Sequence, residues 1–284
     1  MVIAANTTMV YLLMGWDPEE LGKAPFRVSH TGENDTQIAG VPCHIVPGLS
    51  AFVGGDITAG ILACGMLEQE DPMLLIDLGT NGEMALGNRH KLYACATAAG
   101  PAFEGGVNRG IWGADMVRLL QKLLEEGLMD RQGLLVEPYF TQGVRIGDVL
   151  VTQESVRAVQ LAKGAIAAGI ELLTESYGIR LDDISKVVLA GGFGYYLDPA
   201  AAAAIGLLPK ELTARTVTGG NTALGGAALE GSRILTADRK HRPEETPQDD
   251  WDDLQKRRNL QICILNLAKE EKFPEVFLTK INFG

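Results

Sequence analysis

The residues of this chain best suited to chemistry are carboxylates that stand beside glycines. Asp77 follows an apolar run and opens the segment Asp77-Leu78-Gly79-Thr80-Asn81-Gly82-Glu83. A carboxylate at the end of a strand can hold a metal-bound water while nearby backbone N–H groups face a phosphate. The segment also fits an ordinary hairpin, because both residues of an Asn-Gly pair tolerate positive φ. Short motifs arise by chance, so both interpretations stay open at this point.

Two further glycine-rich segments also allow both a nucleotide-binding and a purely structural interpretation. Ala190-Gly191-Gly192-Phe193-Gly194 follows an apolar run, and its glycines would let a flat group such as an adenine or a ribose lie on the backbone. A strand-to-helix turn that needs positive φ is the alternative. Tyr195 and Tyr196 break the dinucleotide-binding fingerprint. Gly219-Gly220-Asn221 precedes a helical pattern, in which Asn221 is a good N-cap.

The elements that must position these segments alternate between strands and helices. Strands are expected at 2–5, 73–76, 84–86, 91–95, 186–190 and 261–267, helices at 50–67, 112–127, 153–177 and 222–235, and a short element at 275–283. This alternation predicts an α/β domain. Asn6 or Thr7 can cap a helix that follows the first strand. The polar residues 237–258 predict an exposed loop.

The composition limits the classes of function. The 284 residues carry a formal net charge of −11, which disfavours a nucleic-acid partner because phosphate binding needs a basic face. The cysteines lie far apart, unlike those of a zinc site or an iron–sulfur cluster, and we expect them to be reduced and mostly buried. Neither a signal-peptide pattern nor a run of about 18 apolar residues is present. We therefore expect a cytoplasmic protein with no membrane partner.

Together and in this order, the glycine-rich segments resemble the ATP-binding signature of the actin/Hsp70/sugar-kinase (ASKHA) superfamily. The Asp77 segment resembles the second phosphate-binding loop and Ala190–Gly194 the adenosine loop. Gly220-Asn221 resembles the second interdomain connection. Gly54-Gly55-Asp56-Ile57-Thr58-Ala59-Gly60 resembles the first, which implies that Asp56 orients the water that attacks the γ-phosphate. Apart from this resemblance, Asp56 is a first-turn carboxylate favoured by the helix macrodipole.

The resemblance narrows to one family, the reductive activators of corrinoid proteins, and covers nearly the whole chain through Phe283. The similar segments are Asn6-Thr7-Thr8-Met9, Asp77–Glu83, Ala98-Ala99-Gly100-Pro101-Ala102-Phe103-Glu104-Gly105, and Ala190–Gly194 followed by Ile205-Gly206-Leu207-Leu208-Pro209. Members of this family use ATP hydrolysis to drive an electron from a [2Fe-2S] cluster to cob(II)alamin. This step returns the corrinoid protein of a methyltransferase system to Co(I).

The resemblance implies an α/β fold of the actin/Hsp70/sugar-kinase (ribonuclease H-like) type, a mixed sheet flanked by helices. It also implies ATP and Mg²⁺ as cofactors, a corrinoid protein as partner, and a homodimer. The implied site residues are Asp56 and Glu104 for catalysis; Asp77, Gly79, Thr80, Asn81, Gly82 and Gly100 at the phosphates, with Asp77 holding Mg²⁺ through a water; and Gly191, Gly192, Phe193, Gly194, Gly220 and Asn221 at the adenosine.

The sequence departs from the family pattern in two places. The family begins with a cysteine-rich ferredoxin domain and a half-domain that carries an Asp-x-Gly-Thr-Thr first phosphate loop, and this sequence contains neither. We therefore expect 1–48 to be a remnant of the N-terminal half-domain, 49–284 to be the C-terminal nucleotide-binding half-domain, and no iron–sulfur cluster in this chain. The segment 105–115 is also shorter than in the family, with Trp112 where a cysteine is expected.

Three functions remain open from the sequence. The first is an ATP-dependent corrinoid activator that either acts with a separately encoded ferredoxin or N-terminal half or is a fragment of a longer activator. The second is a non-catalytic relative that docks a corrinoid protein or binds nucleotide weakly. The third is a small-metabolite kinase of the same superfamily, which is disfavoured because no cluster of substrate-positioning His, Arg or Lys accompanies the phosphate segments.

Overall fold

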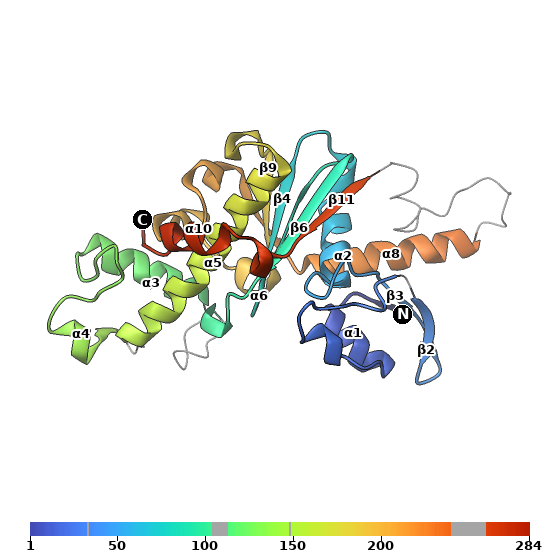
Figure 1. Ribbon diagram of the computed structural model, residues 1–284, viewed down its shortest axis with the longest axis horizontal. Helices are drawn as coiled ribbons and strands as arrows, with labels where there is room; N and C mark the ends of the chain where they lie inside the picture. The colour runs from blue at the N-terminus through green and yellow to red at the C-terminus, as the bar shows by residue number, and fades with distance from the viewer. Residues whose placement is uncertain (33, 104–112, 148, 240–259) are drawn as a thin grey trace. The chain divides into compact units, whose positions relative to one another are not determined.

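The computed structural model describes residues 1–32, 34–103, 113–147, 149–239 and 260–284 (Figure 1). The chain divides into two compact units. The first comprises 1–75, 85–94 and 221–264, and the second comprises 76–84, 95–220 and 265–284. Each unit is described by itself. The boundary expected between residues 48 and 49 stays a prediction.

The largest sheet has the strand order β10-β9-β4-β5-β6-β11. Its strands are β4 (Met73–Leu78), β5 (Gly82–Gly87), β6 (Lys91–Thr97), β9 (Lys186–Ala190), β10 (Thr216–Gly220) and β11 (Gln261–Leu265). β9 and β10 run parallel, and a register irregularity follows Thr218. The apolar runs had predicted five of these strands, and such continuous runs are typical of strands buried on both faces, as β4 and β9 are. β10, with its Thr and Gly residues, was not predicted.

A small sheet and one helix form the N-terminal part of the first unit. β1 (Val2–Ile3) pairs in parallel with β3 (Val41–Ile45), which pairs antiparallel with β2 (Asn34–Ile38). α1 (Thr7–Met14) begins after Asn6, whose side chain accepts the Met9 N–H at 2.9 Å, as the sequence predicted. The Tyr11 hydroxyl accepts the N–H groups of Ser29 and His30, which fixes the loop after α1. The short helix η1 (Glu19–Leu21) completes this region.

Two helices of the first unit, α2 (Gly55–Ala63) and α8 (Thr222–Arg239), pack closely against each other (Figure 1). A Cβ at Gly226 would lie 2.0 Å from the Ala59 carbonyl oxygen, so only glycine allows this approach. The expected helix start at residue 50 was wrong. The Ser50 hydroxyl instead accepts the Val53 N–H at 3.1 Å, which forms a turn before the helix. η2 (Met66–Glu68) follows α2.

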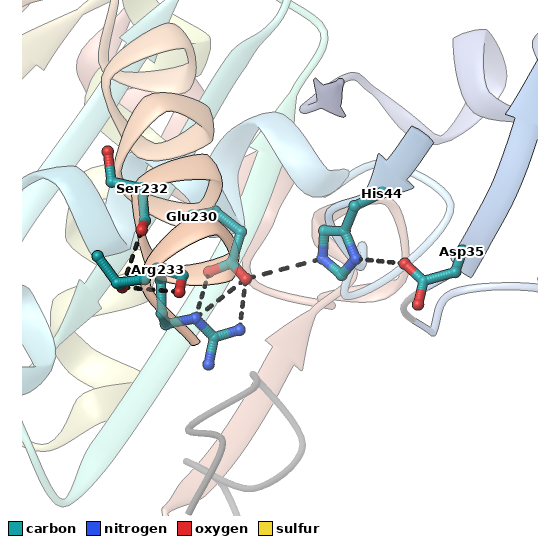
Figure 2. A network of polar contacts seen from close by, with 6 residues as sticks. Asp35, His44, Glu230, Ser232 and Arg233 are labelled. Carbon is teal, nitrogen blue, oxygen red and sulfur yellow. Dashed lines mark hydrogen bonds and ion pairs between the residues drawn. The ribbon is translucent and has the colours of Figure 1, made fainter. Parts of the chain in front are cut away.

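A polar network within the first unit joins the small sheet to α8 (Figure 2). His44 Nδ1 lies 2.8 Å from Asp35 Oδ1, and His44 Nε2 lies 3.8 Å from Glu230 Oε1. Arg233 binds the Glu230 carboxylate through both Nε and Nη2. Glu230 of α8 therefore faces His44 of β3, and His44 in turn contacts Asp35 of β2.

The second unit is organised around the long helix α5 (Gln153–Tyr177), which begins and ends where the sequence predicted. α10 (Phe273–Lys280) packs against it (Figure 1). A Cβ at Gly164 would lie 3.3 Å from Ile281 Cα, and one at Gly169 would lie 2.3 Å from Met84 Cε. The two glycines inside α5 are thus explained by close approaches. The other elements are η3 (Pro101–Phe103), α3 (Gly113–Glu125), α4 (Tyr139–Gln142), β7 (Val144–Ile146), β8 (Val149–Val151), η4 (Leu181–Asp183), α6 (Gly191–Gly194), α7 (Pro199–Ala204), η5 (Lys210–Arg215) and η6 (Leu267–Lys269).

Three smaller expectations can be compared with the structure. The loop expected over 237–258 begins later, because α8 continues through Arg239; its remaining residues lie outside those described. All four cysteines are free, but only Cys43 and Cys95 are buried, whereas Cys64 and Cys263 are partly exposed. Across the described part of the chain, no helix combines the length and the apolar character needed to cross a membrane.

Candidate functional site

The Asp77 segment connects β4 to β5. Its sequence suggested a hairpin turn in which Asn81 and Gly82 adopt positive φ, and the structure differs. Neither Asn81 nor Gly82 has positive φ. Gly82 is needed instead for space, since a Cβ would lie 2.8 Å from Thr97 Oγ1 and 3.1 Å from Ile166 Cγ1. Thr97 Oγ1 donates to the Gly82 carbonyl at 3.2 Å, which holds the start of β5. The hairpin is therefore set by packing inside the second unit and not by an Asn-Gly turn.

The turn itself leaves its middle residues at the surface. Thr80 and Asn81 are exposed, while Asp77 and Gly79 are half-buried. The Gly79 N–H donates to the Asn81 carbonyl at 3.0 Å, so this amide is engaged within the turn. Phosphate binding by this segment stays a prediction, with Thr80 and Asn81 as its most accessible residues.

The Gly191 segment lies directly against Asp77 within the second unit. Gly191 has φ +82°, and a Cβ there would lie 2.5 Å from Asp77 Oδ1 and 2.6 Å from the Leu78 carbonyl oxygen. Both the backbone conformation and the close approach therefore require glycine. Gly192, by contrast, has nothing within 4 Å of its Cβ position and is exposed. Two segments more than a hundred residues apart, predicted to meet phosphate and adenosine, are thus adjacent.

The Phe193 side chain packs in the core of the second unit. Its ring is buried and stacks on Phe103, with ring centroids 4.3 Å apart and planes 6° from parallel. Gly113 allows this arrangement, because a Cβ there would lie 2.5 Å from the Phe103 carbonyl oxygen. The sequence had placed Phe103 only within a family motif, and its role as the partner of Phe193 had no local signal.

The other residues predicted for the nucleotide site lie in different local structures. Gly100 has φ +74° and nothing within 4 Å of its Cβ position, so it is an open turn. Gly220 ends β10 with φ +68°. Asn221 caps α8, since its Oδ1 accepts the Leu224 N–H at 2.8 Å, in agreement with the N-cap alternative. Glu104, the second predicted catalytic residue, lies outside the described residues.

Asp56 stands in the first turn of α2, in the first unit. Its Oδ1 accepts the Ile57 N–H at 2.9 Å, and its own N–H donates to the Ala5 carbonyl at 3.3 Å. Burial raises the pKa of the Asp56 carboxyl, and the backbone N–H groups at the helix start partly offset that rise. A Cβ at Gly55 would lie 2.2 Å from the Val46 carbonyl oxygen, so this helix start is held tightly.

A protein-only metal centre is not formed by the described residues. No three His, Cys, Asp or Glu side chains come together there in a way that could hold a metal ion. Mg²⁺ usually keeps several waters and takes only one or two carboxylates besides the phosphates of its substrate. The single carboxylate of Asp77 beside the Gly191 backbone fits that kind of binding.

Comparisons with known proteins show the family of this chain. The family model described as the C-terminal domain of RACo, the ASKHA domain, matches residues 71–109 and 107–281, and the model of the RACo middle region matches residues 1–69. The two matched segments of the first model meet at 107–109. That position lies within 105–115, the segment expected from the sequence to be shorter than in the family.

Curated relatives and a solved structure give the same picture. The chain is 34% identical to the corrinoid activation enzyme RamQ of Eubacterium limosum, over 80% of this chain and 49% of that enzyme. It is 27% identical to the [Co(II) methylated amine-specific corrinoid protein] reductase of Methanosarcina barkeri, over 68% of this chain and 46% of the reductase. A solved reductive activator for a corrinoid iron–sulfur protein superposes with a TM-score of 0.81 at 26% identity, over 99% of this chain and 52% of that one.

The chain thus spans about half the length of the curated relatives it matches. The match to the ASKHA domain confirms the expected actin/Hsp70/sugar-kinase-like fold class, with a mixed sheet flanked by helices. With both family models together covering nearly all of its residues, the chain belongs to the RACo family.

Proposed function

We propose that this chain is the ATP-using part of an activator that returns a corrinoid protein from Co(II) to Co(I). The observation that carries the proposal is the contact of Gly191 with Asp77, which makes one surface of two segments predicted to bind nucleotide. The names of the two curated relatives, a corrinoid activation enzyme and a Co(II) corrinoid protein reductase, support the choice of substrate.

In this proposal the residues of the second unit bind and orient Mg-ATP. The Asp77 carboxylate holds a water of the Mg²⁺ ion, and the exposed Thr80 and Asn81 face the phosphates. The open backbone at Gly192 receives the adenosine. Bound ATP supplies the free energy of phosphate hydrolysis, which the activator spends on an otherwise unfavourable electron transfer.

That Asp56 of the first unit orients the attacking water stays a prediction from the family resemblance. A base works best when its pKa lies near the working pH, and burial moves the pKa of Asp56 in that direction. Glu104 stays a prediction for the same chemistry. The corrinoid protein is the proposed partner. A ferredoxin as electron donor, a homodimer and a cytoplasmic location also stay predictions.

Titration calorimetry of the chain with Mg-ATP tests the proposal. We expect weak but measurable binding, and Asp77→Asn should weaken it about tenfold or more, because a charge-assisted contact contributes roughly 1.5–3 kcal/mol. Asp17→Asn, at an exposed carboxylate after α1, is the matched control and should bind like the parent. Absence of heat and of a thermal shift at millimolar Mg-ATP would contradict an ATP-using role and favour the non-catalytic alternative.

A further inference from the structure

Two exposed tyrosines stand directly after the Gly191 segment in the second unit, and the proposed ATP site does not yet use them. Tyr195 is 51% exposed and Tyr196 is 65% exposed. Their ring centroids lie 4.8 Å apart with the ring planes at 82°, so the two rings meet edge to face. Single exposed apolar side chains are ordinary, whereas a pair of rings beside a proposed binding site needs an explanation.

The helical turn of α6 decides which residues share a face with these rings. The Tyr195 N–H donates at 3.1 Å to the carbonyl oxygen four residues earlier, so the turn continues to this residue. Phe193 and Leu197 are buried, whereas Gly192, Tyr195 and Tyr196 are exposed. Residues three and four positions apart lie on the same side of a helix. Gly192 and the two tyrosines therefore form one exposed face, and the buried residues anchor the turn in the core.

The glycine on this face is not explained by the fold. Gly192 does not have positive φ, and nothing lies within 4 Å of its Cβ position. Neither the backbone conformation nor an atom of the described residues therefore requires glycine here. A glycine of this kind is typical of a site where a ligand comes close to the backbone. Side chains on a helix lean toward its N-terminus, so the rings of Tyr195 and Tyr196 border the open space beside Gly192.

Tyr195 also lies beside the other glycine predicted to meet the adenosine in this unit. α6 packs against β10, which ends at Gly220. A Cβ at Gly220 would lie 3.6 Å from Tyr195 Cδ2 and 3.9 Å from Tyr195 Cε2. One edge of the ring therefore runs along the end of β10, and Tyr196 contacts the ring as well. These two neighbours hold the Tyr195 ring in place although half of its surface is open.

The chemistry of this face differs from that of the Asp77 segment next to it. Thr80 and Asn81 present polar groups to the solvent, whereas the face after Gly191 presents aromatic rings. The contact of Gly191 with Asp77 joins the two segments. A nucleotide has the same division, with polar phosphates at one end and a flat aromatic base at the other. A base stacks well on an aromatic side chain, since both are flat and largely apolar.

We propose that the Tyr195 ring stacks on the adenine of bound ATP, and that Tyr196 holds this ring in position. The inference rests on the proposed function, because its ligand is the nucleotide of that site. Every base has a π face, so stacking on Tyr195 contributes affinity for a nucleotide and does not select adenine over guanine. In the sequence, the two tyrosines had only broken a dinucleotide-binding fingerprint.

Nuclear magnetic resonance of the tyrosine ring protons in the full chain tests the stacking directly. Tyr195→Phe identifies the Tyr195 signals by their loss. Saturating Mg-ATP should shift these signals upfield, because the ring current of a stacked adenine shields the protons above its face. Inorganic triphosphate with Mg²⁺ has no base and should leave them in place. Equal shifts with both ligands, or no upfield shift with bound Mg-ATP, would overturn the proposal.

Variants measure the contribution of the ring by titration calorimetry. Tyr195→Leu should weaken Mg-ATP binding about tenfold, the usual order for loss of a base-stacking ring, and leave triphosphate binding unchanged. Tyr195→Phe keeps the ring and should bind like the parent. Phe140→Leu, at a 45% exposed ring of α4, is the matched control and should also bind like the parent. Tyr196→Leu should cause a smaller loss than Tyr195→Leu, and the reverse order would overturn the assignment of the stacking ring.

Gly192→Ala tests where the base lies. The new methyl group meets no described atom within 4 Å, so the chain should fold like the parent, but the methyl group takes up the space beside the backbone. We expect Mg-ATP binding to weaken several-fold and triphosphate binding to stay unchanged. Gly32→Ala, at another open glycine without positive φ, is the matched control. Unchanged Mg-ATP affinity in Gly192→Ala would overturn the placement of the base on this face.

The same titrations separate this inference from the proposed function. Equal Mg-ATP binding by the parent and Tyr195→Leu would overturn the stacking and leave the proposed function standing. Absence of Mg-ATP binding by the parent would contradict the proposed function, and the stacking would fall with it. If Tyr195→Leu weakened binding of a corrinoid protein but kept the affinity for Mg-ATP, the rings would belong to a protein-docking surface, and the stacking would again be overturned.

Discussion

Asp56 in the first unit and Lys163 in the second are both largely buried charges, and each is held by a helix end. Asp56 accepts the Ile57 N–H in the first turn of α2, whereas Lys163 donates to the carbonyls of Lys280 and Asn282 at the end of α10. The helix macrodipole favours a negative charge at the first position and a positive charge at the second. Burial still dominates in both cases, because it raises the pKa of Asp56 and lowers that of Lys163.

The two charges differ in how the sequence encodes them. Asp56 lies in a compact motif, directly after Gly54 and Gly55, and its partner is the next residue. The acceptors of Lys163 are 117 and 119 residues away. A charge whose environment is local leaves a pattern in the sequence, whereas a charge whose environment is assembled by tertiary packing does not. The predictions below test this contrast, from the largest expected effect to the smallest.

The largest effect is expected from the glycine that precedes Asp56. In Gly55→Ala the new Cβ would lie 2.2 Å from the Val46 carbonyl oxygen, and a backbone atom cannot move aside cheaply. We expect the free energy of unfolding to fall by about 3 kcal/mol or more, as for severe overpacking. Gly206→Ala beside Lys163 should cost less, roughly 1–2 kcal/mol, because its Cβ meets the end of a flexible side chain and the cost comes mainly from positive φ.

Urea unfolding of both variants gives the comparison. Gly178→Ala is the control for Gly206→Ala, since Gly178 has φ +85° but nothing within 4 Å of its Cβ position. Similar losses in these two variants would show that positive φ alone accounts for Gly206. A loss below about 1 kcal/mol for Gly55→Ala would contradict the tight start of α2.

Local patterns account for what the sequence predicted of the fold. The strand at 186–190 and the helix at 153–177 were found because continuous apolar runs and helical spacing lie within single segments. The start of α2 was placed five residues early, because the Ser50 hydroxyl that suggested a helix cap instead stabilises a turn. The sequence suggested loops and short strands over 15–48 without placing β2 and β3, and it missed α7, because short segments carry little periodicity.

The candidate site was predictable only where glycine had a local signature. Gly191 and Gly192 were identified together, but only coordinates distinguish the one packed on Asp77 from the one that is open. The stacking of Phe103 on Phe193 and the bonds from Lys163 to the carbonyls of Lys280 and Asn282 join residues from distant segments. No spacing rule connects such residues, so the sequence gives no indication of them.

The pH dependence of stability measures the burial of Lys163. Its folded pKa of about 8 lies below the ordinary value of 10.5, so the unfolded chain holds more protons between these values. The cost of the buried charge is therefore fully present below pH 8 and is lost as the pH rises toward 10.5. Relative to Lys163→Met, the parent should gain stability over this range, by at most on the order of 3 kcal/mol.

The measurement is a set of urea unfolding curves for both proteins at several pH values between 7 and 10.5. The difference between parent and Lys163→Met cancels other groups that titrate in this range. Parallel pH profiles would show that Lys163 has similar pKa values in the folded and unfolded chains. Since the variant also leaves the Lys280 and Asn282 carbonyls without a donor, only the pH-dependent part of the difference is used.

The smallest effect on stability is expected for Asp56→Asn. This variant should be slightly more stable than the parent but should turn over ATP more slowly. The folded pKa of Asp56 is raised above the ordinary value of 3.8, so burial of the charge destabilises the chain once the pH exceeds the folded pKa. Asp56→Asn keeps an oxygen that can accept the Ile57 N–H but carries no charge. The variant should therefore be modestly more stable than the parent at pH 7, and this advantage should disappear in acid.

The turnover of ATP by the complete activator should fall by about 10²–10⁴-fold in the same variant, the usual contribution of a general base. Asp17→Asn, at an exposed carboxylate that accepts the Glu19 N–H at 3.0 Å, is the matched control and should change neither quantity appreciably. If Asp56 served only to start α2, Asp56→Asn would destabilise the chain and leave its ATP turnover unchanged. A gain in stability together with lost turnover is expected only if Asp56 is kept charged and buried for chemistry.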